Sequence, residues 1–225
     1  MIRLYFVELD EPVIKRQYDT LFSLIPAERQ RKIDAFRMEA DRRVRLFSEV
    51  LIRSLASQAI CLKPAELLFG QNEYGKPYLV NDPSFQFNIS HTRNALAVGV
   101  SNEPIGVDTE KISDADLRIA NRVFTERERV WVFSGHQNQG RRFFEVWTKK
   151  EAYLKWTGRG FHLDSKSIDI EGLLSDVHLS SMEIHAHMVS VCSMQELNQM
   201  ETVKITGYDI FEMGLRYLQQ HPDYS

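Results

Sequence analysis

The chain has 225 residues, of which 43% are hydrophobic and 26% are charged, and its formal net charge is −3. These values are typical of a globular protein with one large or two small domains. The net charge argues against a protein built around nucleic acid or an anionic membrane surface, so any basic site is expected to be local. No apolar run approaches the ~20 residues that a membrane-spanning helix needs, so we expect no membrane partner.

The amino-terminal stretch MIRLYFVEL predicts an opening strand. Its apolar run is too short for a signal peptide and reaches an acid at Glu8. Cys61 and Cys192 are far apart and have apolar neighbours, which is neither a disulfide framework nor the spacing of metal ligands. We therefore expect reduced core thiols in a cytoplasmic protein.

The segment from Pro26 to about Ser57 has the periodicity of a helix, because apolar residues recur at spacings of three and four. NEYGKPYLV then predicts a turn followed by a short strand. FQFNIS and NALAVGVS predict a pair of strands, and NEPIGVDTE predicts a turn and one more strand.

The second half is more helical. Thr125 and Glu128 form a capping-box pattern that leads into RVWVF. The strongest helical pattern covers residues 141–156 and is closed by Gly158 and Gly160. Strand-like pieces follow at SIDI, EIHAHMVSVCSM and TVKITGYDIF. Each half thus combines helix with antiparallel-looking strands, which predicts an α+β fold with two lobes.

Two acids end the strand in PIGVDTEKI. Asp108 and Glu110 are one residue apart, so their side chains are expected on one face of the strand, roughly 6–7 Å apart. In isolation, the simpler interpretation is that both acids face water.

A third acid lies in the apolar stripe of the 141–156 helix. Glu151 falls between Phe144 and Trp147 on the helical wheel. The simpler interpretation is a pair with Lys155 of the i,i+4 kind. A lone carboxylate on an apolar face otherwise needs a cation, a metal or a raised pKa.

Together the three carboxylates predict a site for a hard cation. Mg²⁺ takes few carboxylates, keeps waters and completes its octahedron from substrate phosphates. This composition points to phosphoryl chemistry, and the spacing of the acids alone goes no further.

Four stretches resemble motifs of the Sfp-type 4'-phosphopantetheinyl transferases, the type that activates the gramicidin S and surfactin synthetases. FNISHT, PIGVDTEKI and VWTKKEAYLKWTGRG resemble the signature motifs, and NEYGKPYL resembles the short motif before them. The resemblance runs from about Leu21 to Gly160, and the order and spacing of the motifs are highly specific.

The resemblance implies an α+β fold in which two similar α/β lobes are related by a pseudo-twofold axis. The N-terminal lobe, residues 1–104, would form the nucleotide side of the coenzyme A site. The C-terminal lobe, residues 105–225, would carry the metal and the catalytic helix. The active site would lie between the lobes of a monomer.

The implied reaction transfers the phosphopantetheine arm of coenzyme A to a serine of an apo acyl or peptidyl carrier protein. It releases adenosine 3',5'-bisphosphate and needs Mg²⁺ or Mn²⁺. Asp108, Glu110 and Glu151 would be the metal ligands. Glu151 would also be the candidate general base, with a metal-bound water as the alternative. Lys155 would neutralise the phosphate under attack and its leaving group, so that the expected catalytic residues are Asp108, Glu151 and Lys155.

The resemblance also implies a binding set for coenzyme A. The 3'-phosphate would be held by basic residues near the start of the chain and by His91, with Ser90 nearby, and Lys150 would be a phosphate or structural neighbour. Without the resemblance these cations are a solvated helix surface, a turn lysine and a loop-end histidine. The implied coenzyme A-binding residues are Arg29, Lys32, Arg45, Lys76, Ser90, His91, Lys150 and Lys155.

Other interpretations fit the sequence less well than the transferase. A non-catalytic module that binds coenzyme A or a carrier protein would have lost a metal ligand or Lys155, and all are present. A metal-dependent phosphohydrolase has only the acidic cluster in its favour. A Ser90–His91 hydrolase pair lacks G-x-S-x-G, and adjacent residues of a strand face opposite sides. The candidate carrier-binding segment runs from about Arg118 to Gly140, although core packing is the default for its Trp131 and Phe133.

Overall fold

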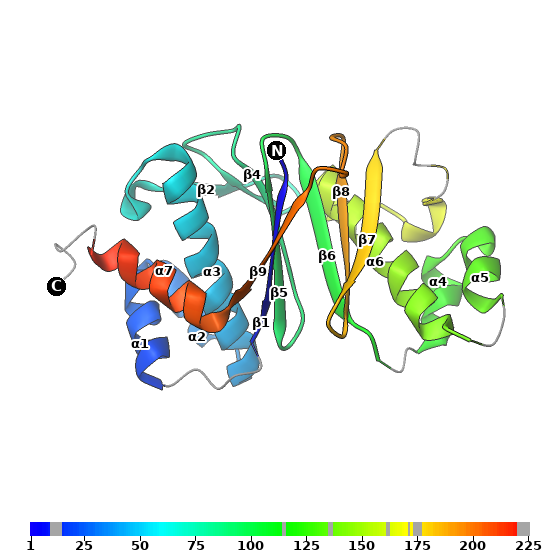
Figure 1. The fold of residues 1–225 in the computed structure, drawn as a ribbon, viewed down its shortest axis with the longest axis horizontal. Coiled ribbons are helices and arrows are strands. Elements are labelled where there is room, and N and C mark those ends of the chain that lie inside the picture. Colours follow the sequence, from blue (N-terminus) through cyan, green and yellow to red (C-terminus); the bar gives the residue numbers. More distant parts are fainter. Residues whose placement is uncertain are drawn as a thin grey trace.

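The computed structural model describes residues 1–9, 15–113, 116–134, 137–160, 163–170, 172 and 177–219 (Figure 1). In these residues the helices are α1 (Lys15–Leu24), α2 (Ala27–Asp34), α3 (Glu39–Ile60), α4 (Ala120–Val123), α5 (Glu126–Phe133), α6 (Gln139–Thr157) and α7 (Gly207–Gln219). The strands are β1 (Arg3–Glu8), β2 (Phe69–Gln71), β3 (Pro77–Leu79), β4 (Gln86–His91), β5 (Ala95–Ser101), β6 (Ile105–Lys111), β7 (His178–Ile184), β8 (His187–Ser193) and β9 (Glu201–Thr206). Single 3₁₀ turns lie at Pro64–Glu66, Leu117–Ile119 and Ser165–Ser167.

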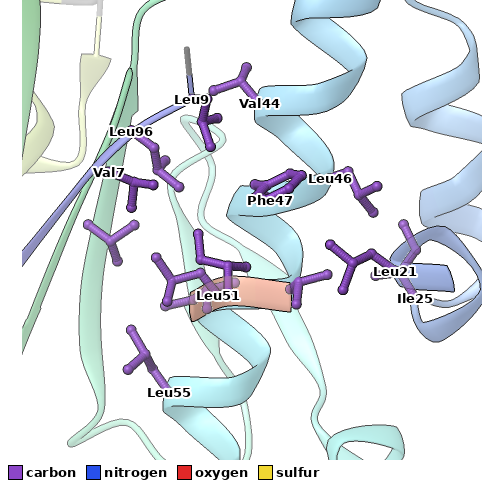
Figure 2. Close-up of a cluster of buried hydrophobic side chains, with 14 of the residues drawn as sticks. Val7, Leu9, Leu21, Ile25, Val44, Leu46, Phe47, Leu51, Leu55 and Leu96 are labelled. Carbon is purple, nitrogen blue, oxygen red and sulfur yellow. The ribbon is translucent and has the colours of Figure 1, made fainter. Parts of the chain in front are cut away.

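The first lobe is built on a four-stranded sheet with the strand order β4-β5-β1-β9. Helices α1, α2, α3 and α7 lie on one side of this sheet (Figure 1). Along β1 and β5, alternate side chains point toward the helices and pack around Phe47 and Leu51 of α3 (Figure 2). This cluster is the largest apolar core of the molecule's described part and fixes α3 against the sheet.

The second lobe is an antiparallel three-stranded sheet with the order β6-β8-β7. Helix α6 crosses one face of this sheet, and Gly106 of β6 lies where the helix comes closest. A Cβ atom at Gly106 would be 1.9 Å from the carbonyl oxygen of Ala152, so only glycine permits this approach. Asp108 and Glu110 follow Gly106 at spacings of two and therefore share the strand face that α6 covers.

The two sheets face each other through their remaining sides. Leu4 and Phe6 of β1, with Ile2 just before the strand, pack with apolar residues of the second sheet in one buried cluster. The result is a layered molecule of helices, sheet, sheet and helices (Figure 1). The predicted α+β fold with two lobes is confirmed.

Side chains, and not a backbone ladder, join the edge strands β4 and β6. The backbone N–H of Val107 donates to Asn88 Oδ1 at 2.8 Å, and that of Thr109 donates to Ser90 Oγ at 3.2 Å. Asn88 and Ser90 are two residues apart on β4, so both point toward β6, whereas Ile89 and His91 point toward the helices.

Several sequence predictions of secondary structure need correction. The helix expected from Pro26 to Ser57 is two helices, α2 and α3, which are separated by residues 35–38. SIDI is not a strand: its two isoleucines alternate because both pack on Leu154 of α6 from an irregular segment. EIHAHMVSVCSM contains a turn, with His185 at φ 52°, and is therefore divided between β7 and β8.

The chain's last described elements return to the first lobe. β9 pairs with β1 in parallel, and Gly214 of α7 packs beside Leu21 and Val50. Residues 201–219 therefore lie with the first sheet, which amends the expected assignment of 105–225 to one lobe. TVKITGYDIF, expected as a strand, is β9 followed by the start of α7.

None of the described helices is long and apolar enough to cross a membrane. The two cysteines differ in their surroundings. Cys192 is buried in β8, as expected, but Cys61 is exposed, because it ends α3 in a left-handed conformation at φ 53°.

Candidate active site between the two lobes

Four of the residues expected to bind coenzyme A lie around one cavity. Arg29 and Lys32 come from α2, Arg45 from α3 and His91 from the end of β4. The cavity has a volume of about 570 Å³, and we call it the basic cavity. Residues 62 positions apart in the sequence thus meet at one surface, which is the arrangement that binding of an anion requires.

Two cations of the basic cavity have acidic partners, Arg29 in Glu49 and Lys32 in Glu28, whereas Arg45 forms no ion pair with a described residue. The Arg45 guanidinium lies 4.0 Å above the Phe36 ring, and its Nε is buried with no hydrogen-bond partner among the described residues. Burial lowers the pKa of Arg45. The pKa of His91 is lowered first by desolvation of its ring and then by the charges of Arg45 and Lys155. A bound anion would relieve each of these costs.

A second group of polar residues joins the two lobes beside this cavity. Asp108 Oδ1 accepts hydrogen bonds from Ser90 Oγ at 2.8 Å and from Lys155 Nζ at 2.7 Å. Lys155 Nζ also donates to Ser90 Oγ at 2.8 Å. We call Ser90, Asp108 and Lys155 the cross-lobe triad, because they come from β4, β6 and α6.

Glu110 and Glu151 complete an acidic group around the triad. The pKa of Glu110 is raised to about 7, first by burial and then by the charge of Asp108, while Lys155 and a hydrogen bond from Trp147 act in the opposite direction. The pKa of Glu151 is raised by burial and by Asp108, and Lys155 lowers it. The three carboxylates predicted from the sequence therefore do interact. The alternative i,i+4 pair of Glu151 and Lys155 is wrong, since Lys155 pairs with Asp108.

Lys76 lies at the other end of β6. Its ammonium donates to the carbonyl oxygens of Ile105 at 3.1 Å and of Trp156 at 3.3 Å. Burial lowers its pKa to about 8. Lys76 therefore ties the β2–β3 ribbon to the second lobe, and its expected contact with the nucleotide or pyrophosphate stays a prediction.

Lys150 was expected to be either a phosphate neighbour or a structural residue, and it has the structural role. Its ammonium pairs with Glu128 at 2.8 Å, and both side chains are 2% exposed. It also donates to the carbonyl oxygens of Ser165 and Ile168. The expected contact of Lys150 with coenzyme A is therefore corrected, because a buried and fully bonded ammonium does not reach a phosphate.

Comparisons with known proteins agree with this geometry. Residues 104–202 match the family described as 4'-phosphopantetheinyl transferase superfamily, and residues 11–103 match 4'-phosphopantetheinyl transferase, N-terminal. The chain is 36% identical over 172 residues to the 4'-phosphopantetheinyl transferase gsp of Aneurinibacillus migulanus, covering 76% of this chain and 72% of that one. It is 33% identical to a 4'-phosphopantetheinyl transferase of Bacillus subtilis, covering 80% of each chain. It is 29% identical to 4'-phosphopantetheinyl transferase Sfp of Bacillus subtilis strain 168, covering 75% of this chain and 76% of that one.

The chain belongs to the 4'-phosphopantetheinyl transferase superfamily. The predicted family and the predicted 4'-phosphopantetheinyl transferase activity are therefore confirmed. The matched boundary between residues 103 and 104 lies one residue before the expected division of the lobes.

The acidic group of this transferase suits a hard cation in its chemistry. Asp108 Oδ2 is buried and has no hydrogen-bond partner among the described residues. Burial and the charge of Asp108 raise the pKa values of Glu110 and Glu151, and a divalent cation would relieve both costs. In the described arrangement no three His, Cys, Asp or Glu side chains are grouped so that they could hold a metal, and Lys155 is the cation beside Asp108.

Three residues of the site had no place in the sequence predictions. Asn88 joins the lobes through Val107, and Glu49 and Arg53 pair inside α3 at 2.8 Å. The available signals were weak. Asn88 stands two residues before Ser90 in FNIS, and Glu49 and Arg53 are an i,i+4 pair in an otherwise apolar run.

Proposed function

We propose that this transferase moves the 4'-phosphopantetheine arm of coenzyme A to a serine hydroxyl of an apo acyl or peptidyl carrier protein. One observation carries the proposal: adjacent residues of β4 connect the two parts of the site. His91 lines the basic cavity, and Ser90 belongs to the cross-lobe triad. One coenzyme A molecule can therefore place its 3'-phosphate among cations and its pyrophosphate beside the acidic group.

The transfer breaks a phosphoanhydride bond of the coenzyme A pyrophosphate and forms a phosphoester bond to the carrier serine. The serine oxygen forms a bond to the phosphorus that bears pantetheine, and the bond from that phosphorus to the bridging oxygen breaks. The serine proton goes to the Glu151 carboxylate, whose raised pKa suits a general base. Adenosine 3',5'-bisphosphate leaves with the bridging oxygen, and the Lys155 ammonium neutralises the charge that develops there.

Asp108, Glu110 and Glu151 would hold Mg²⁺, or Mn²⁺ in its place. The ion would neutralise and orient the pyrophosphate. Lys155 then serves two anions. It compensates Asp108 in the free protein, as its 2.7 Å contact shows, and it turns to the phosphate when coenzyme A binds.

Intact-mass analysis of carrier proteins tests the proposal. An apo peptidyl carrier and an apo acyl carrier protein are each incubated with the chain, coenzyme A and Mg²⁺, with and without EDTA. We expect each accepted carrier to gain one phosphopantetheine, and EDTA to prevent the gain. If coenzyme A binds but neither carrier gains mass, the alternative of a non-catalytic coenzyme A or carrier-protein binding module replaces the proposal.

Glu110→Gln tests the metal shell. We expect the Mg²⁺ concentration for half-maximal transfer to rise at least about tenfold, because the variant loses a charged oxygen ligand without a change of shape. Glu201→Gln is the control, since Glu201 is an exposed acid that pairs with Arg3 at the edge of the first sheet. Titration with Mn²⁺ followed by electron paramagnetic resonance measures the same affinity without turnover. An unchanged Mg²⁺ requirement would remove Glu110 from the shell.

We also propose that the carrier docks on the segment from Arg118 to Gly140. Three apolar residues of α5 are exposed there, Val130 at 62%, Trp131 at 42% and Phe133 at 37%. The Arg142 guanidinium lies 5.6 Å from the Trp131 ring and adds positive charge. An exposed aromatic side chain beside an arginine is typical of a protein interface, and the positive charge suits an acidic carrier helix.

Trp131→Ala tests this surface. We expect the KM for the carrier to rise about tenfold and the KM for coenzyme A to stay the same, because truncation of an aromatic anchor costs ~1–2 kcal/mol of binding. Tyr208→Ala is the matched control, since Tyr208 is 58% exposed on α7 of the first lobe. Equal effects of the two variants would contradict the assignment.

The chain is further proposed to act as a monomer in the cytoplasm. Both cysteines are free thiols, which suits a reducing compartment. Light scattering coupled to gel filtration measures the mass of the particle, and a dimer would overturn the proposed state.

A further inference from the structure

A buried carboxylate lies at the floor of the basic cavity. Glu49 of α3 is 7% exposed and binds two arginines with its two oxygens. Oε1 accepts from Arg53 Nε at 2.8 Å. Oε2 accepts from Arg29 Nε at 2.9 Å, and Arg29 Nη2 lies 2.8 Å from the same oxygen.

Arg53 is held on three sides, so Glu49 has a fixed position. The Arg53 guanidinium donates to the Pro64 carbonyl oxygen at 3.2 Å and lies 5.0 Å above the Phe69 ring. Arg53 as a whole is only 6% exposed. A carboxylate bonded to such a guanidinium cannot change its rotamer without leaving a buried charge unpaired.

Arg29 reaches Glu49 from a different helix and remains 42% exposed. Glu49 uses only the Nε–Nη2 side of its guanidinium. An arginine has five N–H donors, so the remaining donors are left for another anion. Arg29 also lies where the basic cavity meets a second cavity of about 480 Å³, because Arg29, Lys32, Glu49 and Ile89 line both.

We propose that Glu49 is a positioning residue for coenzyme A: it orients Arg29 so that the free edge of the guanidinium meets the 3'-phosphate. Arg53 in turn fixes Glu49. This inference rests on the proposed function and adds to it the residue that decides preference for coenzyme A over 3'-dephospho-coenzyme A. The physical reason is preorganisation, since an arginine that is already oriented loses less side-chain entropy when the phosphate binds.

If Glu49 acted on the phosphate only through its negative charge, a substitution at Glu49 would change phosphate binding in the opposite direction. A carboxylate near a phosphate repels it, so removal of the negative charge would strengthen binding of the anion. If Glu49 orients Arg29, the same removal weakens binding. The sign of the change therefore separates the two roles.

The experiment compares Glu49→Gln with Glu28→Gln. Glu28 is the matched control because it lines the second cavity and pairs with Lys32 at 2.6 Å, but its side chain is 68% exposed. For Glu49→Gln we expect the Kd of adenosine 3',5'-bisphosphate, measured by calorimetry, to rise about tenfold. The KM for coenzyme A rises equally, while kcat and the KM for 3'-dephospho-coenzyme A do not change. For Glu28→Gln we expect equal or tighter binding.

Thermal unfolding shows whether the Glu49→Gln protein is folded. If that protein is not folded, Arg29→Lys tests the inference in its place, since it changes only a partly exposed side chain. A lysine ammonium has no planar edge, so it cannot pair with Glu49 on one side and present two parallel N–H groups to phosphate on the other, and the same loss of preference is expected.

Equal or tighter binding by Glu49→Gln, or an unchanged Kd in Arg29→Lys, overturns the inference. If Glu49→Gln binds the bisphosphate more weakly than the wild-type chain does, but the wild-type chain transfers no phosphopantetheine, the proposed function is wrong and this inference is supported. A wild-type chain that does not bind the bisphosphate overturns both.

Discussion

We expect Lys155→Met to lower kcat about 10²- to 10³-fold at saturating coenzyme A and Mg²⁺, the usual effect when one charge-stabilising donor is removed. In the proposed mechanism the Lys155 ammonium is the group that faces the leaving bisphosphate. Methionine keeps most of the length and the apolar packing of the lysine side chain. The fall in kcat therefore measures the effect of the charge and its hydrogen bonds. Single-turnover transfer followed by mass spectrometry gives the size of this fall.

The same substitution is expected to affect stability. Lys155 is the partner of Asp108, whose side chain is 5% exposed. Without this cation a buried carboxylate is uncompensated, and we expect the free energy of unfolding to fall by about 1–3 kcal/mol, less than for a fully buried pair because the Lys155 side chain is 29% exposed. Added Mg²⁺ should recover part of that loss. Urea unfolding with and without Mg²⁺ measures both changes.

Lys149→Met is the control for Lys155→Met. Lys149 stands on the same helix and pairs with Glu145 at 2.8 Å, with both side chains about a quarter exposed. Such an i,i+4 pair contributes only a few tenths of a kcal/mol. If Lys149→Met reduced turnover as much as Lys155→Met, the effect would belong to helix α6 in general and not to the triad.

The second large effect is expected at Gly106. In Gly106→Ala the new Cβ would be 1.9 Å from the Ala152 carbonyl oxygen and 2.5 Å from the Trp156 nitrogen. Both are backbone atoms, so α6 itself must move away from β6. We expect the free energy of unfolding to fall by about 3 kcal/mol, at the upper end of the usual cost of overpacking. Urea unfolding measures it.

Turnover should fall in the same variant for a geometric reason. Glu151 and Lys155 stand on α6, whereas Asp108 stands on β6, so a displaced helix separates them. A shift of about 1 Å can cost about 10²-fold in rate. Gly140→Ala is the control for the stability effect, because its nearest neighbour is 3.7 Å away, and in a helix alanine is favoured over glycine by about 0.5–1 kcal/mol. A Gly106→Ala protein with wild-type stability would show that α6 does not approach β6 this closely.

Much of the local structure could be predicted from the sequence. The strands β4, β5 and β6, the capping box at Thr125 and Glu128, and the end of α6 at Gly158 all lie where the patterns indicated. These features depend on residues within about four positions of one another, and side-chain periodicity records them directly. The same periodicity places Asp108 and Glu110 on one face of β6.

The spacing of apolar residues predicted secondary structure less reliably where tertiary packing, and not backbone geometry, imposed that spacing. Ile168 and Ile170 alternate as in a strand, yet they are anchors of an irregular segment on Leu154. The parallel pairing of β9 with β1 joins residues about 200 positions apart, and nothing in TVKIT indicates its partner.

Sequence by itself determined the family, the reaction class and the residue types of the site. Only the tertiary structure decided which charge meets which. Lys155 pairs with Asp108 and not with Glu151, which is closer in the sequence. Lys150 is buried with Glu128, and Glu49 of α3 pairs with Arg29 of α2. The physical reason is that a buried charge must be compensated by whichever partner the packing of distant elements brings within about 3 Å, and that partner is not encoded in local spacing.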